Sequence, residues 1–172
     1  MESLIAALRD PMSYPHPVDA VEVVETHISW VRLAGEYAYK VKKPVKLPFL
    51  DFSTLAARRR YCEEELRLNR RTAPELYLEV VPISQTARGP AFAAAGEPIE
   101  YAVKMRRFAS AALADDMARR GALGATQIDA IAAVLARLHG AAPRAGLADA
   151  YGAPAQIAAP AIGNFDQIAA FG

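Results

Sequence analysis

The fold is decided by residues 37–43, YAYKVKK, read together with residues 62–71, CEEELRLNRR. Successive side chains of a β-strand point to opposite faces of the sheet, so Ala38, Lys40 and Lys42 would share one face. A small residue two positions before a lysine leaves space for a flat ring beside an ammonium group. The alternative is that both lysines form the solvated face of a half-buried hairpin.

A long helix is predicted over residues 54–71, because this run contains neither Gly nor Pro and follows Ser53, a good N-cap residue. At about 100° per residue, its apolar side chains gather into one broad arc, and Glu65 falls near the middle of that arc. Glu63 and Glu64 fall outside the arc or at its margin. The arc consists of Leu55, Tyr61, Cys62, Leu66 and Leu68.

A carboxylate in the middle of a buried helix face is costly unless a cation meets it, and the adjacent strand offers Lys40. We therefore predict an ion pair between Lys40 and Glu65. Glu64 is the nearest rival, because a one-residue error in the helical phase would exchange the two glutamates. In the alternative interpretation, residues 63–65 are a solvated charge run. The arginines that would offset this run are Arg58, Arg59, Arg60 and Arg67.

Other segments have the alternation typical of strands. They are residues 21–26, 28–33, 76–83 and 99–105. Gly35 would turn the chain between the second and third strands, since glycine tolerates the positive φ of a tight hairpin. Gly89, Pro90 and Gly96 would lie in the connection between the last two strands. This order predicts an α+β fold, in which an antiparallel sheet of about five strands packs against one long helix.

After residue 108 the pattern becomes helical, so we expect two parts, residues 1–108 and 109–172. In the second part, Thr126 would cap a core helix. The apolar residues of this helix at helical spacing are Ile128, Ile131, Leu135 and Leu138. From Gly140 onward, many Pro, Ala and Gly residues predict loops and short helical turns.

The composition excludes several classes of protein. The chain of 172 residues has 20 Lys and Arg against 19 Asp and Glu, a formal charge of +1, which argues against binding a nucleic-acid backbone through charge alone. One cysteine, Cys62, allows neither an intrachain disulfide nor a thiolate metal cluster and favours a reducing, cytoplasmic setting. Residues 1–15 contain charged residues and no long apolar run, so we expect neither a secretory signal nor a membrane span.

Three stretches of the sequence resemble the N-terminal part of the aminoglycoside phosphotransferase-like proteins, which have a protein-kinase fold. They are THISWVRLAGEYAYKVKKPVKLPFLDFSTLAARRRYCEEELRLNRR at residues 26–71, LYLEVVPIS at 76–84 and EYAVKMRRF at 100–108. More narrowly, the sequence is similar to an uncharacterised bacterial group whose longer members fuse this domain to a P-loop kinase domain. The resemblance implies a kinase-like N-lobe with its hinge over residues 1–108. Residues 109–172 would be a truncated, helical segment of a C-lobe.

The resemblance also implies that this part of the protein binds ATP with Mg²⁺. In the kinase fold the third strand ends in an alanine, one further residue and a lysine, which match Ala38, Tyr39 and Lys40. That lysine contacts the α- and β-phosphates of the nucleotide while it pairs with a helix glutamate, here Glu65.

Two further regions would contact the nucleotide in this resemblance. The turn over residues 25–29 corresponds to the Gly-rich loop of protein kinases but contains no glycine, so the hydroxyls of Thr26 and Ser29 would donate to phosphates in its place. Both are otherwise explained as polar residues at strand ends. Backbone groups near Met105 and Arg107 would read the adenine edge from the hinge.

By resemblance, the chain is the nucleotide-binding portion of a phosphotransferase-like kinase. Nothing after His139 matches the Asp and Asn of a catalytic loop or the later metal-binding Asp, so we expect an incomplete kinase with no catalytic residue and no metal ligand in this chain. The other partners would be an unknown small-molecule acceptor and the missing C-lobe or a fused P-loop kinase domain, with no membrane. The alternative is a noncatalytic interaction module that uses the basic face of the helix over residues 54–71. RNA or another nucleic acid is a less favoured partner.

Overall fold

The structure is a computed structural model that describes residues 1–146, 149 and 152–169, apart from the side chains of residues 166 and 167. The chain forms two compact units, Met1–Ala130 and Ile131–Gly172. The first unit contains a six-stranded antiparallel sheet, so the predicted α+β fold is confirmed.

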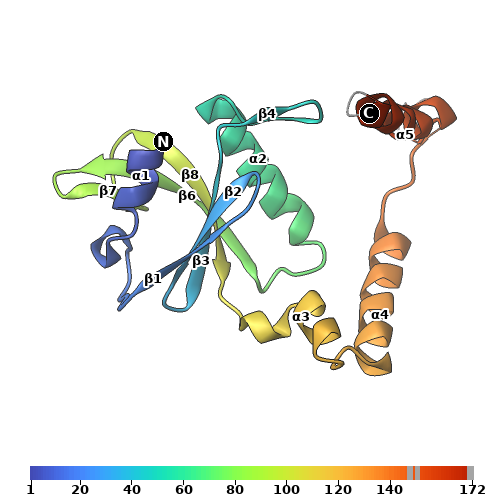
Figure 1. The fold of residues 1–172 in the computed structure, drawn as a ribbon, viewed down its shortest axis with the longest axis horizontal. Helices are drawn as coiled ribbons and strands as arrows, with labels where there is room; N and C mark the ends of the chain where they lie inside the picture. The colour runs from blue at the N-terminus through green and yellow to red at the C-terminus, as the bar shows by residue number, and fades with distance from the viewer. Residues whose placement is uncertain (147–148, 150–151, 170–172) are drawn as a thin grey trace. The chain divides into compact units, whose positions relative to one another are not determined.

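The sheet has the strand order β1-β2-β3-β8-β6-β7 (Figure 1). Its strands are β1 (Val21–Glu25), β2 (Ser29–Ala34), β3 (Tyr37–Lys42), β6 (Tyr77–Thr86), β7 (Gly89–Phe92) and β8 (Pro98–Arg106). All but β7 fall on segments predicted to be strands. Because β8 inserts between β3 and β6, the lysine strand β3 lies in the interior of the sheet and has a hydrogen-bonded neighbour on each side.

The remaining elements are helices and one small hairpin. They are α1 (Glu2–Ala7), η1 (Pro11–Ser13), the hairpin strands β4 (Lys46–Leu47) and β5 (Leu50–Asp51), α2 (Leu55–Asn69), η2 (Ser110–Ala112), α3 (Ala114–Arg119), α4 (Ala125–Ala141) and α5 (Pro154–Ala169). The long helix α2 packs against β8 and β6 on one face of the sheet (Figure 1).

The turn between β2 and β3 forms where the sequence predicts it. Ala34 pairs with Tyr37 across a two-residue loop, and Gly35 has a φ of +56°. A side chain there would also approach the carbonyl oxygen of Pro17, which lies 3.2 Å from the position of a Cβ atom. Glycine at this position therefore sets the register that places Lys40 and Lys42.

The strand β7 occupies a stretch that the sequence analysis assigned to a connection. Gly89 begins this strand with a φ of +117°, and the Thr86 hydroxyl donates to the Gly89 carbonyl at 2.7 Å. Pro90 lies in β7 at the edge of the sheet, where its missing N–H breaks no ladder to a second neighbour. Turn residues at both ends of a four-residue strand hid its pattern.

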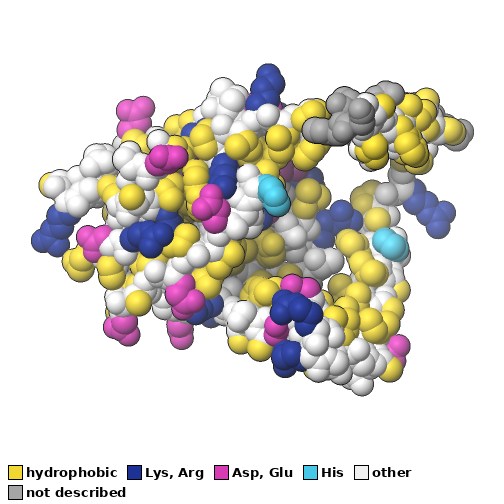
Figure 2. Space-filling view, viewed as in Figure 1, with side chains coloured by type: hydrophobic (Ala, Val, Ile, Leu, Met, Phe, Trp, Pro, Cys, Tyr) yellow, Lys and Arg dark blue, Asp and Glu magenta, His cyan; other side chains and the backbone are white. Residues whose placement is uncertain are grey.

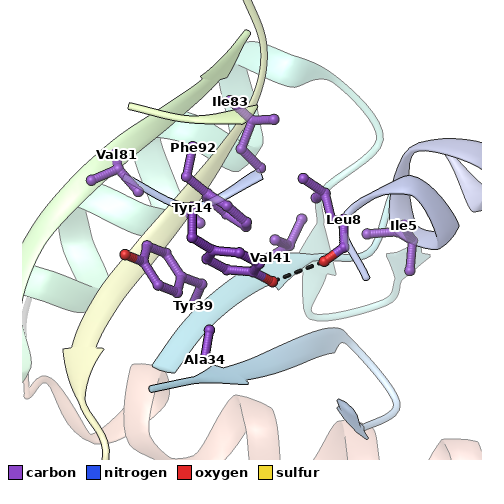
Figure 3. Packing of buried hydrophobic residues seen from close by; sticks show 10 residues of the cluster. Ile5, Leu8, Tyr14, Ala34, Tyr39, Val41, Val81, Ile83 and Phe92 are labelled. Carbon is purple, nitrogen blue, oxygen red and sulfur yellow. Dashed lines mark hydrogen bonds between the residues drawn. The ribbon is translucent and has the colours of Figure 1, made fainter. Parts of the chain in front are cut away.

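An N-terminal segment that the sequence analysis did not predict covers the face of the sheet opposite α2. Leu8 and Tyr14, the residues that directly follow α1 and η1, pack with Tyr39, Val41 and Phe92 of the sheet (Figure 3). The Tyr14 hydroxyl donates to the Leu8 carbonyl at 2.9 Å. Full burial of one such apolar side chain contributes about 1.5–3 kcal/mol to the free energy of unfolding, so this segment stabilises the sheet on the face opposite Lys40 and Lys42.

The helix α2 begins one residue later than predicted. Its N-cap is Thr54, whose hydroxyl oxygen accepts a hydrogen bond from the Ala57 N–H at 3.1 Å. Ser53 instead donates from its N–H and its hydroxyl to the Asp51 carboxylate. These hydrogen bonds, together with Lys46, lower the pKa of Asp51 to about 2.

The C-terminal helices differ from the prediction in two ways. Thr126 lies inside α4, and no residue of this helix is buried, so the prediction of a core helix capped by Thr126 is not confirmed. The stretch predicted as loops and short turns contains the 16-residue helix α5, with Pro160 inside it. Its alanines favour helix strongly enough to accommodate one proline. Figure 2 shows apolar side chains exposed along both helices.

Part of the predicted Pro/Ala/Gly-rich tail, residues 147, 148, 150, 151 and 170–172, lies outside the described residues. Among the residues that are described, no helix combines the length and the apolar character needed to cross a membrane.

Candidate functional site

The strand β3 places two lysines on the face of the sheet that packs against α2. Lys40 lies opposite Val31 of β2 and Val103 of β8, and Ala38 lies opposite Met105. Directly opposed residues of antiparallel strands point to the same face. Three of the predicted site residues, Ala38, Lys40 and Met105, therefore share one face of the sheet.

Glu65 of α2 binds both lysines. Its Oε1 accepts a hydrogen bond from Lys40 Nζ at 2.8 Å, and its Oε2 accepts one from Lys42 Nζ at 2.7 Å. The predicted ion pair between Lys40 and Glu65 is confirmed, and the contact of Lys42 is an addition that the sequence analysis missed. We call Lys40, Lys42 and Glu65 the lysine–glutamate triad.

The triad holds two positive charges and one negative charge in a largely buried place. The side chains of Lys42 and Glu65 are 4% and 13% exposed, whereas that of Lys40 is 27% exposed. Burial alone would raise the pKa of Glu65, but the ammonium groups of Lys40 and Lys42 together outweigh it and hold this pKa below its usual value. Glu65 is therefore ionised at neutral pH, and the triad carries a net charge of about +1.

Lys42 lies in an enclosed environment. Its Nζ is 4.9 Å from the ring centroid of Phe52, a geometry in which the ring face attracts a cation. Ser29 lies opposite Lys42 in the register of β2 and β3, and the buried Ser29 hydroxyl has no hydrogen-bond partner in the described part of the chain. Lys42 is thus held between a ring, a strand and Glu65, and solvent scarcely reaches it.

The buried side of α2 carries a stripe of mostly polar side chains, and of the predicted apolar arc Cys62 is buried while Leu55, Tyr61 and Leu66 are half-buried. Arg58, Cys62, Glu65 and Asn69 follow one another at intervals of four, three and four residues, which places them on one face of the helix. Leu68, predicted to lie in the arc, is 46% exposed. Burial raises the pKa of the Cys62 thiol to about 12, so this cysteine is not a reactive thiolate.

A second buried ion pair lies two helical turns before Glu65. Arg58 Nε donates to Glu100 Oε2 of β8 at 2.8 Å, and these side chains are 7% and 0% exposed. Arg58 Nη1 also donates to the carbonyls of Phe52 and Ser53, while the N–H of Tyr101 donates to Glu100 Oε1. Arg58 is therefore not one of the solvated arginines of the alternative interpretation, because it fastens the start of α2 to the sheet.

The Thr26 hydroxyl makes its hydrogen bonds within the turn between β1 and β2. Thr26 Oγ1 accepts from the Ser29 N–H at 3.0 Å and donates to the Ser29 carbonyl at 3.1 Å. This hydroxyl is thus engaged within the protein, and the hydroxyl of Ser29 is buried. The turn is held to β3 by the N–H of Lys43, which donates to the carbonyl of Ile28.

The residues expected at the hinge are also engaged within the fold. The Arg107 N–H donates to the Glu36 carbonyl at 2.8 Å, and its guanidinium binds the Glu22 carboxylate at 2.6 Å. The N–H of the preceding residue, Arg106, donates to the Leu76 carbonyl. The Thr26 hydroxyl and the Arg107 groups are therefore engaged away from the triad. The Ser29 hydroxyl has no partner among the described residues and lies in register with Lys42, and Ala38 and Met105 share the face of the triad.

Most arginines of α2, and Arg70 at its C-cap, have partners inside the protein. Glu64 pairs with Arg67 at 2.7 Å on the exposed side of the helix, so Glu65 and not Glu64 meets the lysines. Arg59 pairs with Glu63 at 2.9 Å. Arg70 donates to carbonyls at the start of β6. This surface is partly neutralised, which weakens the alternative of a basic interaction face.

One helical signal could have revealed Arg58 as a buried residue before the structure was known. Arg58 precedes Glu65 by seven residues, which is close to two full turns of an α-helix, so the two side chains must lie on the same face. An interpretation that buries Glu65 therefore also predicts burial of Arg58. Glu100 offered no comparable signal, because its neighbours in β8 are a mixture of polar and apolar residues.

The arrangement is suited to binding an anion. An ammonium group has three N–H donors, and Lys40 uses one of them on Glu65 while remaining partly exposed. The net positive charge in a largely buried place adds a long-range attraction for phosphate oxygens. Among the described residues, no group of three or more His, Cys, Asp or Glu side chains converges as metal ligands would.

Comparisons with known proteins identify relatives without a stated activity. An uncharacterized protein of Mycobacterium tuberculosis is 38% identical to this chain over 146 residues, and an uncharacterized protein of Mycobacterium bovis matches equally well. The match covers 83% of this chain and 28% of each relative, so the chain spans little more than a quarter of their length. No protein-family model and no solved structure matches the chain.

Proposed function

We propose that this chain is the ATP-binding portion of a phosphotransferase-like kinase, with a protein-kinase-like N-lobe around the triad. The observation that supports the proposal most directly is the pairing of Lys40 with Glu65 across a strand and a helix, at 2.8 Å. In kinases a strand lysine and a helix glutamate form the same pair, and the lysine binds the α- and β-phosphates. The spacing Ala38-x-Lys40 agrees with this role.

In this proposal the protein binds and orients the nucleotide. Lys40 donates to phosphate oxygens, and Ala38, a small and buried residue on the same face of the sheet, lies beside the adenine ring. Mg²⁺ enters with the phosphates of the nucleotide, because the described residues offer it no ligand cluster of their own. We assign neither a transfer step nor an acceptor to this chain.

The proposal is tested by thermal unfolding with and without Mg-ATP. A ligand that binds only the folded state stabilises it by about 2.7 kcal/mol at a concentration 100 times the Kd. We expect Mg-ATP to raise the Tm of the wild-type chain and to leave that of Lys40→Ala unchanged, with Mg²⁺ alone as the control. Absence of a shift at millimolar Mg-ATP would contradict the proposal and favour a noncatalytic interaction module.

A further inference from the structure

The two lysines of the triad differ in how far solvent reaches them. Lys42 is 4% exposed and Lys40 is 27% exposed, although each donates one hydrogen bond of similar length to a different oxygen of Glu65. The ring of Phe52 covers the ammonium group of Lys42. A ligand that approaches from solvent can therefore reach Lys40 but not Lys42.

We propose that Lys42 is the fixed anchor of Glu65, and that Lys40 is the lysine that turns its remaining donors toward an anionic ligand. This inference rests on the proposed function, because the ligand concerned is the triphosphate of that site. Lys42 is a positioning residue in this proposal: it acts through Glu65 and never touches the nucleotide.

The second lysine keeps Glu65 paired while Lys40 binds a ligand. When a lone lysine shifts toward a phosphate, a nearly buried carboxylate loses part of its pairing, and an unpaired buried charge is costly. In the triad, Glu65 keeps the hydrogen bond from Lys42 to its Oε2 while Lys40, which donates to Oε1, shifts toward the ligand. Lys42 also supplies the excess positive charge, which favours a polyanion over a ligand with a single charge.

The first experiment compares the ammonium groups by ¹⁵N NMR of the full chain, with each lysine assigned by substitution. We expect the Nζ protons of Lys42 to exchange with water measurably more slowly than those of Lys40. Addition of Mg-ATP should shift the Lys40 resonance and leave the Lys42 resonance in place. Equal exchange rates of the two lysines, or a larger shift of the Lys42 resonance on addition of Mg-ATP, would contradict the proposal that Lys42 is the fixed anchor of Glu65.

The second experiment measures the Kd of Mg-ATP by calorimetry. We expect Lys42→Met to weaken binding roughly ten-fold, within the range for residues of one salt-bridge network. Lys42→Arg should restore most of the affinity, because arginine keeps the charge. A lower Tm for Lys42→Met with an unchanged Kd would show a merely structural role and overturn the proposal.

Lys104→Met is the matched control for Lys42→Met. Lys104 also makes one carboxylate contact, to Glu79 at 2.9 Å, and one ring contact, to Tyr37 at 4.6 Å. Its register partner is Tyr39, so it lies on the opposite face of the sheet from the triad. We expect this variant to leave the Kd of Mg-ATP unchanged. A ten-fold loss in Lys104→Met would mean that any lysine of the sheet has the same effect, which contradicts the proposal.

The two proposals fail in different ways. If wild-type protein binds neither Mg-ATP nor inorganic tripolyphosphate, the nucleotide function is wrong, but the exchange rates of Lys40 and Lys42 still test the anchor. If Mg-ATP binds and shifts the Lys40 resonance, while the Nζ protons of Lys42 exchange as fast as those of Lys40, the nucleotide function is supported and the proposal that Lys42 anchors Glu65 is wrong.

Discussion

The helix α2 is held to the sheet by two buried ion-pair clusters that differ in their balance of charge. At its start, Arg58 and Glu100 match one cation with one anion, and carbonyl and N–H groups fill further hydrogen-bonding positions. Two turns later, Glu65 is shared by two lysines, one of which is partly exposed. The first cluster is closed and neutral, and the second is open on one side and positive.

This difference favours a structural role for the first cluster and agrees with the binding role proposed for the second. A neutral pair whose members also bond to backbone groups has little left to offer a ligand, so its contribution is to fix the position of α2. A cluster with an excess cation has both a spare charge and spare donors. If the proposed binding role is right, the balance of charge in a buried cluster indicates better than its burial where an anion binds.

The largest expected effect is the loss of the closed pair. Arg58→Ala leaves the Glu100 carboxylate buried without its cation, and breaking one side of a buried ion pair costs about 3–5 kcal/mol. We therefore expect urea unfolding to show a fall of that size in the free energy of unfolding. A loss below about 1 kcal/mol, typical of a surface pair, would contradict the closed cluster.

The double variant Arg58→Met with Glu100→Met is the control for that experiment. Replacing both members of a buried pair by apolar side chains of similar size is often nearly neutral. We expect this variant to recover most of the stability that Arg58→Ala loses. A double variant as unstable as Arg58→Ala would show that Arg58 and Glu100 stabilise the fold by more than mutual neutralisation of their charges.

The next effect is the coupling within the triad. A double-mutant cycle of Lys40→Met and Glu65→Gln should give an interaction energy of about 0.5–3 kcal/mol, because the two side chains share a short hydrogen bond. A parallel cycle of Lys42→Met and Glu65→Gln should couple as well. Strict additivity in both cycles would mean that Glu65 meets neither lysine in solution.

A smaller and more diagnostic effect is the pH dependence of the two clusters. The folded-state pKa of Glu65 is lowered, so its stabilisation is present above about pH 4.3 and is lost as the pH falls through the folded pKa. Burial raises the pKa of Glu100 despite its contacts with Tyr101 and Arg58, so this carboxylate costs stability as the pH rises toward its folded pKa.

The two carboxylates therefore predict opposite trends. The stability lost in Glu65→Gln should grow from about pH 3 to about pH 6, and that lost in Glu100→Gln should shrink over the same range. Urea unfolding of both variants and wild type at several pH values measures the two trends. Parallel curves would mean that the two clusters do not differ in their balance of charge.

The sequence predicted most of the sheet and one of the two contacts in the triad, the one between Lys40 and Glu65. Alternation and one glycine turn located β1, β2 and β3, and helical phase selected Glu65. The contact of Lys42 was missed because a strand pattern gives the face of a side chain but not how far it reaches. Glu100 was missed because the partner of a buried charge depends on which strands become neighbours, and the insertion of β8 beside β3 is a long-range event.

The N-terminal segment and the C-terminal helices escaped prediction for different reasons. The six residues of α1 are too few for a clear periodicity, and only contact with the sheet stabilises so short a helix. In α5, proline and glycine suggested loops, but local alanine content outweighed them. Local patterns therefore fail where packing or composition over a longer window decides the structure.

The smallest expected effect concerns the glutamate that precedes Glu65 in the sequence. Glu64 is on the exposed side of α2, where Arg67 lowers its pKa through a hydrogen bond and its charge. Solvent screens such exposed pairs, so Glu64→Gln should leave the free energy of unfolding and the Mg-ATP shift unchanged within error. The same substitution at Glu65 should change both. If instead Glu64→Gln removed the Mg-ATP shift and Glu65→Gln kept it, the helix would meet the lysines one residue out of phase, and the open cluster would have to be rebuilt around Glu64.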